Sequence, residues 1–294
     1  MWSRNMSEHW IDRAWKDIIK KNPDDAISYF MPELAAERDY SQQPQFAGTE
    51  HPAIGGKSDK DGTISDVCMA VPLKTGNTPR ALFLIEQQHE KDDSLPRRIF
   101  RSWYRASDEH QIPVTSLAVY TGRAKPINAY SVSWQGTSVS FTYNVYSVAA
   151  ASAEELKHDR RAFAIPLLAG KRMLEANGNP LKRGEYSLEL LSLIKERVSD
   201  EVKAWYFRKF TSNILQIDKV DIDPKVKEVW KMQFKTMVEV VSDINIRDAK
   251  EEGMEEGMEK GKFEVARKML ARKMAVSDII DLTGLDESDI LALS

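Results

Sequence analysis

Two short apolar segments separated by a polar turn limit most strongly what this chain can fold into. Residues 63–71 alternate between two faces as a β-strand does, and residues 81–86 form the run ALFLIE. Between them lies KTGNTP, residues 74–79, in which glycine, asparagine and proline favour a turn. The pattern predicts a β-hairpin whose second strand ends at Glu86, followed directly by two glutamines.

The rest of the pattern predicts an α/β protein. Helical spacing of apolar residues indicates helices, and alternation indicates further strands. The expected helices are 10–21, about 24–37 with a break at Pro32, and 94–110; the further strands are 114–120 and 138–148. From about residue 154 the strand pattern fades, and amphipathic helices are predicted at 188–215 and 226–241. We expect a mixed central sheet flanked by helices, followed by an α-helical C-terminal region.

Composition excludes several classes of protein. With 42% apolar residues the chain can build a packed core, which excludes general disorder. The single cysteine, Cys68, excludes a disulfide framework and a cysteine-based zinc cluster and fits a reducing cytoplasm. The N-terminus lacks an apolar leader and no apolar stretch is long enough for a membrane span, so we expect a soluble cytoplasmic protein with no membrane partner. The net charge of −3 means that a nucleic acid must be held by a local patch or by metal ions.

Three regions are expected along the chain: a core at 1–150, a helical region at 151–245 and a tail at 246–294. The tail contains EEGMEEGMEKGK, residues 251–262, whose glycines each cost a helix roughly 1 kcal/mol. We interpret this repeat as a solvated connector or as a close contact between helices. Two short helices around 283–285 have helix-turn-helix proportions, typical of a helical hairpin, an oligomerisation element or a nucleic-acid contact. Their acidic second segment disfavours binding to phosphate.

The predicted hairpin brings two acidic residues into register. If the turn is centred on Gly76, Asp66 and Glu86 lie at equal distances on either side of it and face each other. Side chains opposite each other on one face have Cβ atoms about 4.5–5.5 Å apart, and alternation places Gln88 on that face too. Two carboxylates so close repel unless a shared proton, a basic residue such as Arg97, or a divalent cation lies between them. Oxygen ligands of this kind suit Mg²⁺ or Mn²⁺.

The same residues resemble a nuclease signature. Asp66 followed by Glu86-Gln87-Gln88 is similar to the D…(E/D)-x-K/Q pattern of the PD-(D/E)XK nuclease superfamily. More narrowly, the chain resembles the bacterial Rpn family of recombination-promoting nucleases, which are also described as PD-(D/E)XK transposases. The resemblance is carried by ISDVCMAV at 64–71, LFLIEQQHE at 82–90, DRAWK at 12–16, LAVYTG at 117–122 and KMLARKMAVSDIIDLTGLDESDILAL at 268–293. Within the second of these motifs, Gln87 and His89 stand where the family usually has histidine and serine.

The resemblance implies a restriction-endonuclease-like fold and a metal-dependent endodeoxyribonuclease that hydrolyses phosphodiester bonds in DNA. It implies a cellular role in DNA recombination or mobile-element transfer. Asp66 and Glu86 would bind Mg²⁺, or alternatively Mn²⁺, with the main-chain carbonyl of Gln87 as a further ligand. Gln88 would orient the attacking water, although an amide cannot supply the positive charge of the superfamily's usual lysine. The alternative is a catalytically weak or inactive nuclease-fold protein that binds nucleic acid or protein.

Further candidate residues remain open at this point. The superfamily often adds an acid from the first helix of its core, and Asp12, Asp25 and Glu33 are the candidates here. We interpret His89 and His110 as surface residues.

The segment 94–110 carries a row of basic residues, namely Arg97, Arg98, Arg101 and Arg105. They either grip phosphates beside a metal site or form a solvated, ion-paired face. Trp103 and Tyr104 are interpreted as core residues and not as base-stacking residues. We also consider a homo-oligomer formed through the C-terminal helices.

Overall fold

The structure of the protein is a computed structural model. It describes residues 9–46, 66–74, 79–235, 265–270, 274–276, 279 and 283. The chain divides into two compact units, residues 1–232 and 233–294. The turn at 75–78, the repeat at 251–262 and residues 284–286 of the tail lie outside the described residues.

A five-stranded mixed sheet forms the centre of the first unit, with the strand order β1-β2-β3-β4-β7. The strands are β1 (Gln45–Phe46), β2 (Val67–Pro72), β3 (Arg80–Gln88), β4 (Val114–Tyr120) and β7 (Asn144–Ser147). The first three strands pair in antiparallel fashion, whereas β3, β4 and β7 run parallel. The predicted α/β core with a mixed sheet and flanking helices is confirmed.

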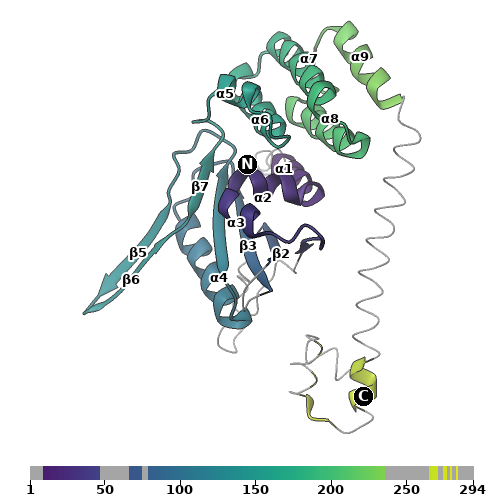
Figure 1. Ribbon diagram of the computed structural model, residues 1–294. Coiled ribbons are helices and arrows are strands. Elements are labelled where there is room, and N and C mark those ends of the chain that lie inside the picture. Colours follow the sequence, from purple (N-terminus) through teal and green to yellow (C-terminus); the bar gives the residue numbers. More distant parts are fainter. Residues whose placement is uncertain are drawn as a thin grey trace. The chain divides into compact units, whose positions relative to one another are not determined.

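Helices cover the sheet and continue beyond it (Figure 1). They are α1 (His9–Lys21), α2 (Pro23–Phe30), α3 (Pro32–Glu37), α4 (Leu95–His110), α5 (Ala153–His158), α6 (Ala164–Ala176), α7 (Pro180–Arg197), α8 (Glu201–Leu215) and α9 (Pro224–Lys235). The predicted break at Pro32 separates α2 from α3, because proline has no N–H for a continuing helix. No helix among the described residues is long and apolar enough to cross a lipid bilayer.

The hairpin of β2 and β3 has the predicted register, with Val67 opposite Ile85 and the following pairs in step. Leu84 lies on the face of β3 that packs against α4, where it clusters with Ala106. Because side chains alternate along a strand, Glu86 faces α4 as well. The hairpin register therefore fixes the face on which this carboxylate lies.

Trp15 anchors α1 between the sheet and the C-terminal helices. The residue is 1% exposed, and its indole meets the ring of Phe210 on α8 edge-on, with the ring centroids 4.9 Å apart. Gly170 of α6 lies against the same indole, where an added Cβ would be 2.8 Å from the ring. The buried tryptophan thereby positions the next residue, Lys16, relative to β3, which α1 contacts.

The prediction of a single helix at 188–215 is wrong. In the structure α7 ends at Arg197 and α8 begins at Glu201. Asp200 starts the second helix as its N-cap, since its side chain accepts the main-chain N–H of Lys203 at 3.0 Å. The apolar spacing continues across this interruption, which is why periodicity alone did not reveal it.

The prediction of a single strand at 138–148 is also wrong, because this segment does not form one continuous strand. It is divided between β6 (Thr137–Thr142) and β7, which belong to different sheets. Tyr143 lies at the division, where its hydroxyl donates a hydrogen bond to the carbonyl of Ile127 at 2.6 Å. β6 instead pairs with β5 (Ala129–Trp134), a strand that the sequence pattern did not predict, and the two form a separate hairpin.

The second unit contains a small apolar cluster among its described residues. Ala266 and Ile279 are buried there, and four partly buried side chains pack around them, namely Met269, Leu270, Met274 and Val276.

Candidate active site

Asp66 lies one residue before β2 and is held at the end of the sheet. Its Oδ2 accepts the main-chain N–H of Gln87 at 2.6 Å, and its Oδ1 is 2.8 Å from Nζ of Lys16 on α1. The first of these contacts sets the carboxylate beside the residue that follows Glu86. Asp66 and Glu86 are therefore neighbours, with Asp66 contacting α1 and Glu86 facing α4.

Glu86 is a buried carboxylate with one unsatisfied oxygen. The residue is 3% exposed, and its Oε2 is 3.3 Å from Nη2 of Arg98. Its Oε1 has no hydrogen-bond partner in the described part of the chain. Burial, reinforced by the negative charge of Asp66 and opposed by Arg98, raises the pKa of Glu86 to about 8. Glu86 thus keeps a proton at neutral pH unless a cation takes the place of that proton.

Two basic residues each bridge a pair of carboxylates. Besides Asp66, Lys16 contacts Asp12 at 2.8 Å, and besides its contact with Glu86, Arg98 contacts Asp92 at 2.5 Å. Burial by itself lowers the pKa of Lys16, but its hydrogen bonds to the two aspartates outweigh this effect and raise the pKa. These ion pairs join four acidic to two basic side chains, so full ionisation would leave two excess negative charges. That excess equals the charge of one divalent cation.

The main chain of Gln87 and that of Gln88 face different neighbouring strands. The carbonyl of Gln88 accepts the N–H of Thr121 at 2.9 Å, so this peptide faces β4. The main chain of Gln87 faces the side of β2 instead, because its N–H donates to Asp66. A residue of an antiparallel strand presents its N–H and its carbonyl to the same neighbour. The carbonyl of Gln87 is therefore expected on the side of Asp66. The side-chain amide of Gln88 donates to the carbonyl of Glu90 at 2.7 Å.

A hydrogen-bonded chain ties the end of β3 to β4. The side-chain amide of Gln87 donates to Oγ1 of Thr121, and Nδ1 of His89 lies 3.3 Å from the same oxygen. Gly122 permits this close approach, because a Cβ at that position would overlap the carbonyl oxygen of His89. His89, predicted to lie at the surface, is half-buried, whereas His110 is exposed as predicted.

The three candidates for an additional acid differ in their positions. Asp12 on α1 joins the site through Lys16. Asp25 instead pairs with Lys203 of α8 at 2.7 Å, and Glu33 is exposed on α3. Lys16 ends the DRAWK motif, but the sequence pattern gave it no role at the site, although its spacing of four residues from Asp12 is typical of an ion pair on a helix.

The arginines of α4 do not form one exposed row. Arg98 contacts carboxylates at the site, Arg105 is buried and Arg97 is exposed. Trp103 is partly buried in the core as predicted. Tyr104, also predicted in the core, is 47% exposed.

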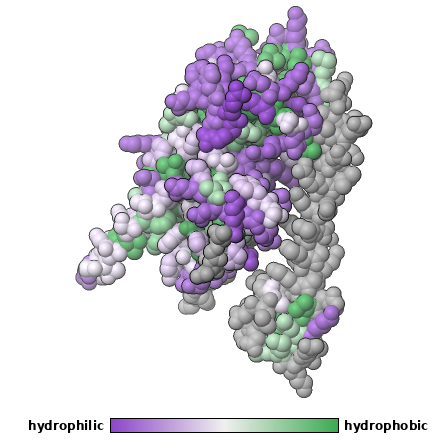
Figure 2. Space-filling model, viewed as in Figure 1, coloured by the Kyte–Doolittle hydropathy of each residue, from purple (hydrophilic) through white to green (hydrophobic). Residues whose placement is uncertain are grey.

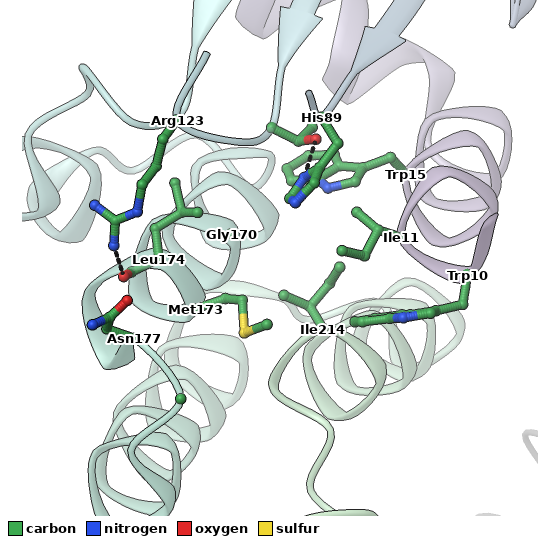
Figure 3. A pocket seen from close by; sticks show the side chains of 12 residues that line it. Trp10, Ile11, Trp15, His89, Arg123, Gly170, Met173, Leu174, Asn177 and Ile214 are labelled. Carbon is green, nitrogen blue, oxygen red and sulfur yellow. Dashed lines mark hydrogen bonds between the residues drawn. The ribbon is translucent and has the colours of Figure 1, made fainter. Parts of the chain in front are cut away.

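A separate cavity of about 190 Å³ lies between α1, α6, α8 and the end of β3 (Figure 3). Most of its wall is apolar and comes from Trp10, Ile11, Trp15, Met173, Leu174 and Ile214. His89 and Arg123 add polar groups at its edge, and Arg123 donates to the carbonyl of Leu174. The carboxylates of the site do not line this cavity.

Among the described residues, no group of three or more histidine, cysteine, aspartate or glutamate side chains is placed to hold a metal ion. A cation at this site would use the two carboxylates of Asp66 and Glu86 together with main-chain oxygen and water. No family model, no curated protein and no solved structure matches the chain. A proposal of function therefore rests on the geometry of the site and on the motifs of the sequence.

Proposed function

We propose that the protein is a Mg²⁺-dependent endonuclease that hydrolyses phosphodiester bonds in DNA, with Mn²⁺ as an alternative cofactor. The observation that carries this proposal is Oε1 of Glu86, which is buried beside a second carboxylate, Asp66, and has no hydrogen-bond partner among the described residues. A buried oxygen without a partner costs free energy until a proton or a cation satisfies it. Hydrolysis of DNA in recombination or mobile-element transfer is the role that the resemblance to the Rpn family adds.

The donor set fits a hard divalent ion. Asp66, Glu86 and the main-chain carbonyl of Gln87 supply only oxygen, which Mg²⁺ and Mn²⁺ prefer. When bound, the ion would lower the pKa of the attacking water and offset the charge on the phosphate. The excess negative charge among the ion pairs of the site would favour its binding.

Lys16 gives the site a positive charge that Gln88, on the strand that carries Glu86, does not provide. Its ammonium group lies beside Asp66, and its side chain is 30% exposed, so a phosphate oxygen can approach it. Gln88 occupies the strand position where the superfamily often has lysine, and its amide can orient a water but carries no charge. Asp12 holds the ammonium group in place from one helical turn away.

A catalytically weak or inactive nuclease-fold protein that binds nucleic acid or another protein is the second candidate. It is favoured by the ion pairs themselves, because Lys16 and Arg98 already offset part of the negative charge that a cation would neutralise. This candidate predicts binding without cleavage and no change of melting temperature with Mg²⁺.

Plasmid nicking with Mg²⁺ tests the proposal. We expect the natural protein to nick the plasmid, and Asp66→Asn and Glu86→Gln each to reduce nicking by at least about 10²-fold. The matched control is Asp93→Asn, because Asp93 pairs with Lys91 at the exposed surface and not in the site. Mg²⁺ should raise the melting temperature of the natural protein and of the control only. Equal nicking by all four proteins would refute the proposed site, and binding of DNA without nicking would favour the second candidate.

A further inference from the structure

The hairpin of β5 and β6 projects from the body of the first unit as a two-stranded ribbon (Figure 1). Its strands pair in continuous register from Ala129 opposite Thr142 to Trp134 opposite Thr137, with no bulge. Gln135 and Gly136 connect them, both with positive φ, which is the two-residue turn that suits the twist of a hairpin.

The ribbon belongs to an uncharged stretch of the chain. No aspartate, glutamate, lysine or arginine occurs in residues 126–153, although 30% of the whole chain is charged. The register gathers the large side chains on one face, namely Tyr130, Val132, Trp134, Val139 and Phe141. Small hydroxyl residues occupy the opposite face, namely Ser131, Ser133, Ser138, Ser140 and Thr142.

Only the base of the apolar face is covered. The ring of Phe100 on α4 lies 5.2 Å from that of Tyr130 and 5.5 Å from that of Phe141, measured between centroids. Farther out, Val132 is 49% exposed and Trp134 is 74% exposed. In Figure 2 the ribbon stands out as a white and green projection from a mainly purple body. The outer half of the ribbon thus keeps an apolar face in contact with solvent.

No strand among the described residues pairs with either long edge of the ribbon. Proteins usually protect an edge strand with a charged side chain, a proline or a bulge. β5 and β6 contain none of these. An isolated two-stranded ribbon is also only marginally stable in water, so further strands would stabilise it.

We propose that the ribbon pairs edge to edge with the same ribbon of a second copy of this chain. A two-fold axis perpendicular to the sheet would join the two ribbons into four strands and keep both apolar faces on one side. An uncharged strand can pair with its own copy because no like charges come to lie opposite each other. The ribbon has no arginine or lysine to form ion pairs with the phosphates of a nucleic acid. It also has no charge by which a charged protein partner would be selected.

The backbone of the ribbon allows a selective test. The pair closing a two-residue turn exchanges hydrogen bonds across the ribbon, so alternate residues, including Ser131 and Ser140, direct their N–H groups outward. Replacing both serines by proline removes an outward donor from each edge while sparing the bonds between β5 and β6. The variant Ser131→Ala/Ser140→Ala keeps both donors and serves as the matched control.

Sedimentation of the full-length protein at micromolar concentrations distinguishes the outcomes. We expect the natural protein and the alanine control to sediment as dimers. The dissociation constant of the dimer should be at least tenfold higher for the proline variant. The melting temperature of the proline variant should match that of the control under conditions where both are monomers, which shows that the core has folded. A monomeric natural protein overturns the inference. A proline variant that dimerises like the natural protein also overturns it, and directs attention to the C-terminal helices instead.

Discussion

Glu86 links protonation to the stability of the folded protein. Its pKa rises from the ordinary 4.5 to about 8 on folding, chiefly through burial. A carboxyl group whose pKa is higher in the folded than in the unfolded protein stabilises the fold when it is protonated. This contribution is fully present at a pH below the pKa of the unfolded state. That contribution is lost as the pH rises through the folded pKa. We therefore expect this residue to lower the free energy of unfolding by a few kcal/mol between about pH 4.5 and 8.

Urea unfolding across this pH range measures the effect. Glu86→Gln carries no titrating group, so its free energy of unfolding should fall less steeply over the same range. Glu154→Gln is the control, because the side chain of Glu154 is 71% exposed, and it should follow the natural protein. Parallel curves for the natural protein and Glu86→Gln would show that Glu86 is already ionised in the folded state.

Lys16 is predicted to matter for turnover more than for folding. Lys16→Met keeps most of the length of the side chain but removes the charge beside Asp66, so we expect nicking to fall by about 10²-fold. Mg²⁺ should still raise the melting temperature of this variant, because the carboxylates remain. Lys16→Arg should recover part of the activity, and Lys91→Met, a change at an exposed ion pair, should have none of these effects. Full activity of Lys16→Met would remove Lys16 from the mechanism.

At the scale of the element, the interruption between α7 and α8 has a measurable cause. The carboxylate of Asp200 accepts the N–H of Lys203 and so satisfies a donor that the first turn of α8 leaves open. We expect Asp200→Ala to lower the free energy of unfolding by about 1 kcal/mol. Ser199→Ala, one residue earlier and outside the cap, should change it by less than about 0.5 kcal/mol. Chemical unfolding of both variants checks this, and equal effects would mean that the cap is not what starts α8.

Local patterns predicted those elements that local physics determines. Alternation and turn residues predicted the register of β2 with β3, and the apolar run at 114–120 predicted the bounds of β4. The patterns failed where tertiary contacts decide. Tyr143 separates β6 from β7 through a hydrogen bond to Ile127, and nothing in the alternating pattern marks that point.

The sequence paired the two acids of the candidate site, whereas it revealed the basic half only in part. Arg98 was one of four candidate arginines, and Lys16 appeared in a motif without a role at the site. Asp66 and Glu86 could be paired because one hairpin carries both of them. Lys16 and Arg98 come from helices on either side of that hairpin in the chain, and their contacts depend on how α1 and α4 pack on β3. The positive charge at the site is therefore a property of the assembled fold.

At the scale of the whole molecule, every residue assigned to the site belongs to the unit of residues 1–232. A chain ended at Lys250 keeps this unit complete, including Trp230 of α9, which is 1% exposed and donates its indole N–H to Ser187 at 3.1 Å. We expect this shortened chain to nick DNA and to gain thermal stability from Mg²⁺ as the full chain does. If the protein is instead a binding module that acts through its tail, the same truncation should abolish DNA binding.

A second truncation, before Pro224, supplies the control for folding. It removes Trp230 and exposes the apolar surface that this residue covers, so it should lower the free energy of unfolding by about 3–5 kcal/mol. Loss of nicking in both truncated chains, with the melting temperature of the longer one unchanged, would mean that the tail takes part in the reaction. If the chain ended at Lys250 still nicks DNA and the chain ended before Pro224 does not, the tail is not needed for the reaction. The chemistry would then belong to the unit that contains Asp66, Glu86 and Lys16, and the shorter chain would be inactive because that unit has lost stability.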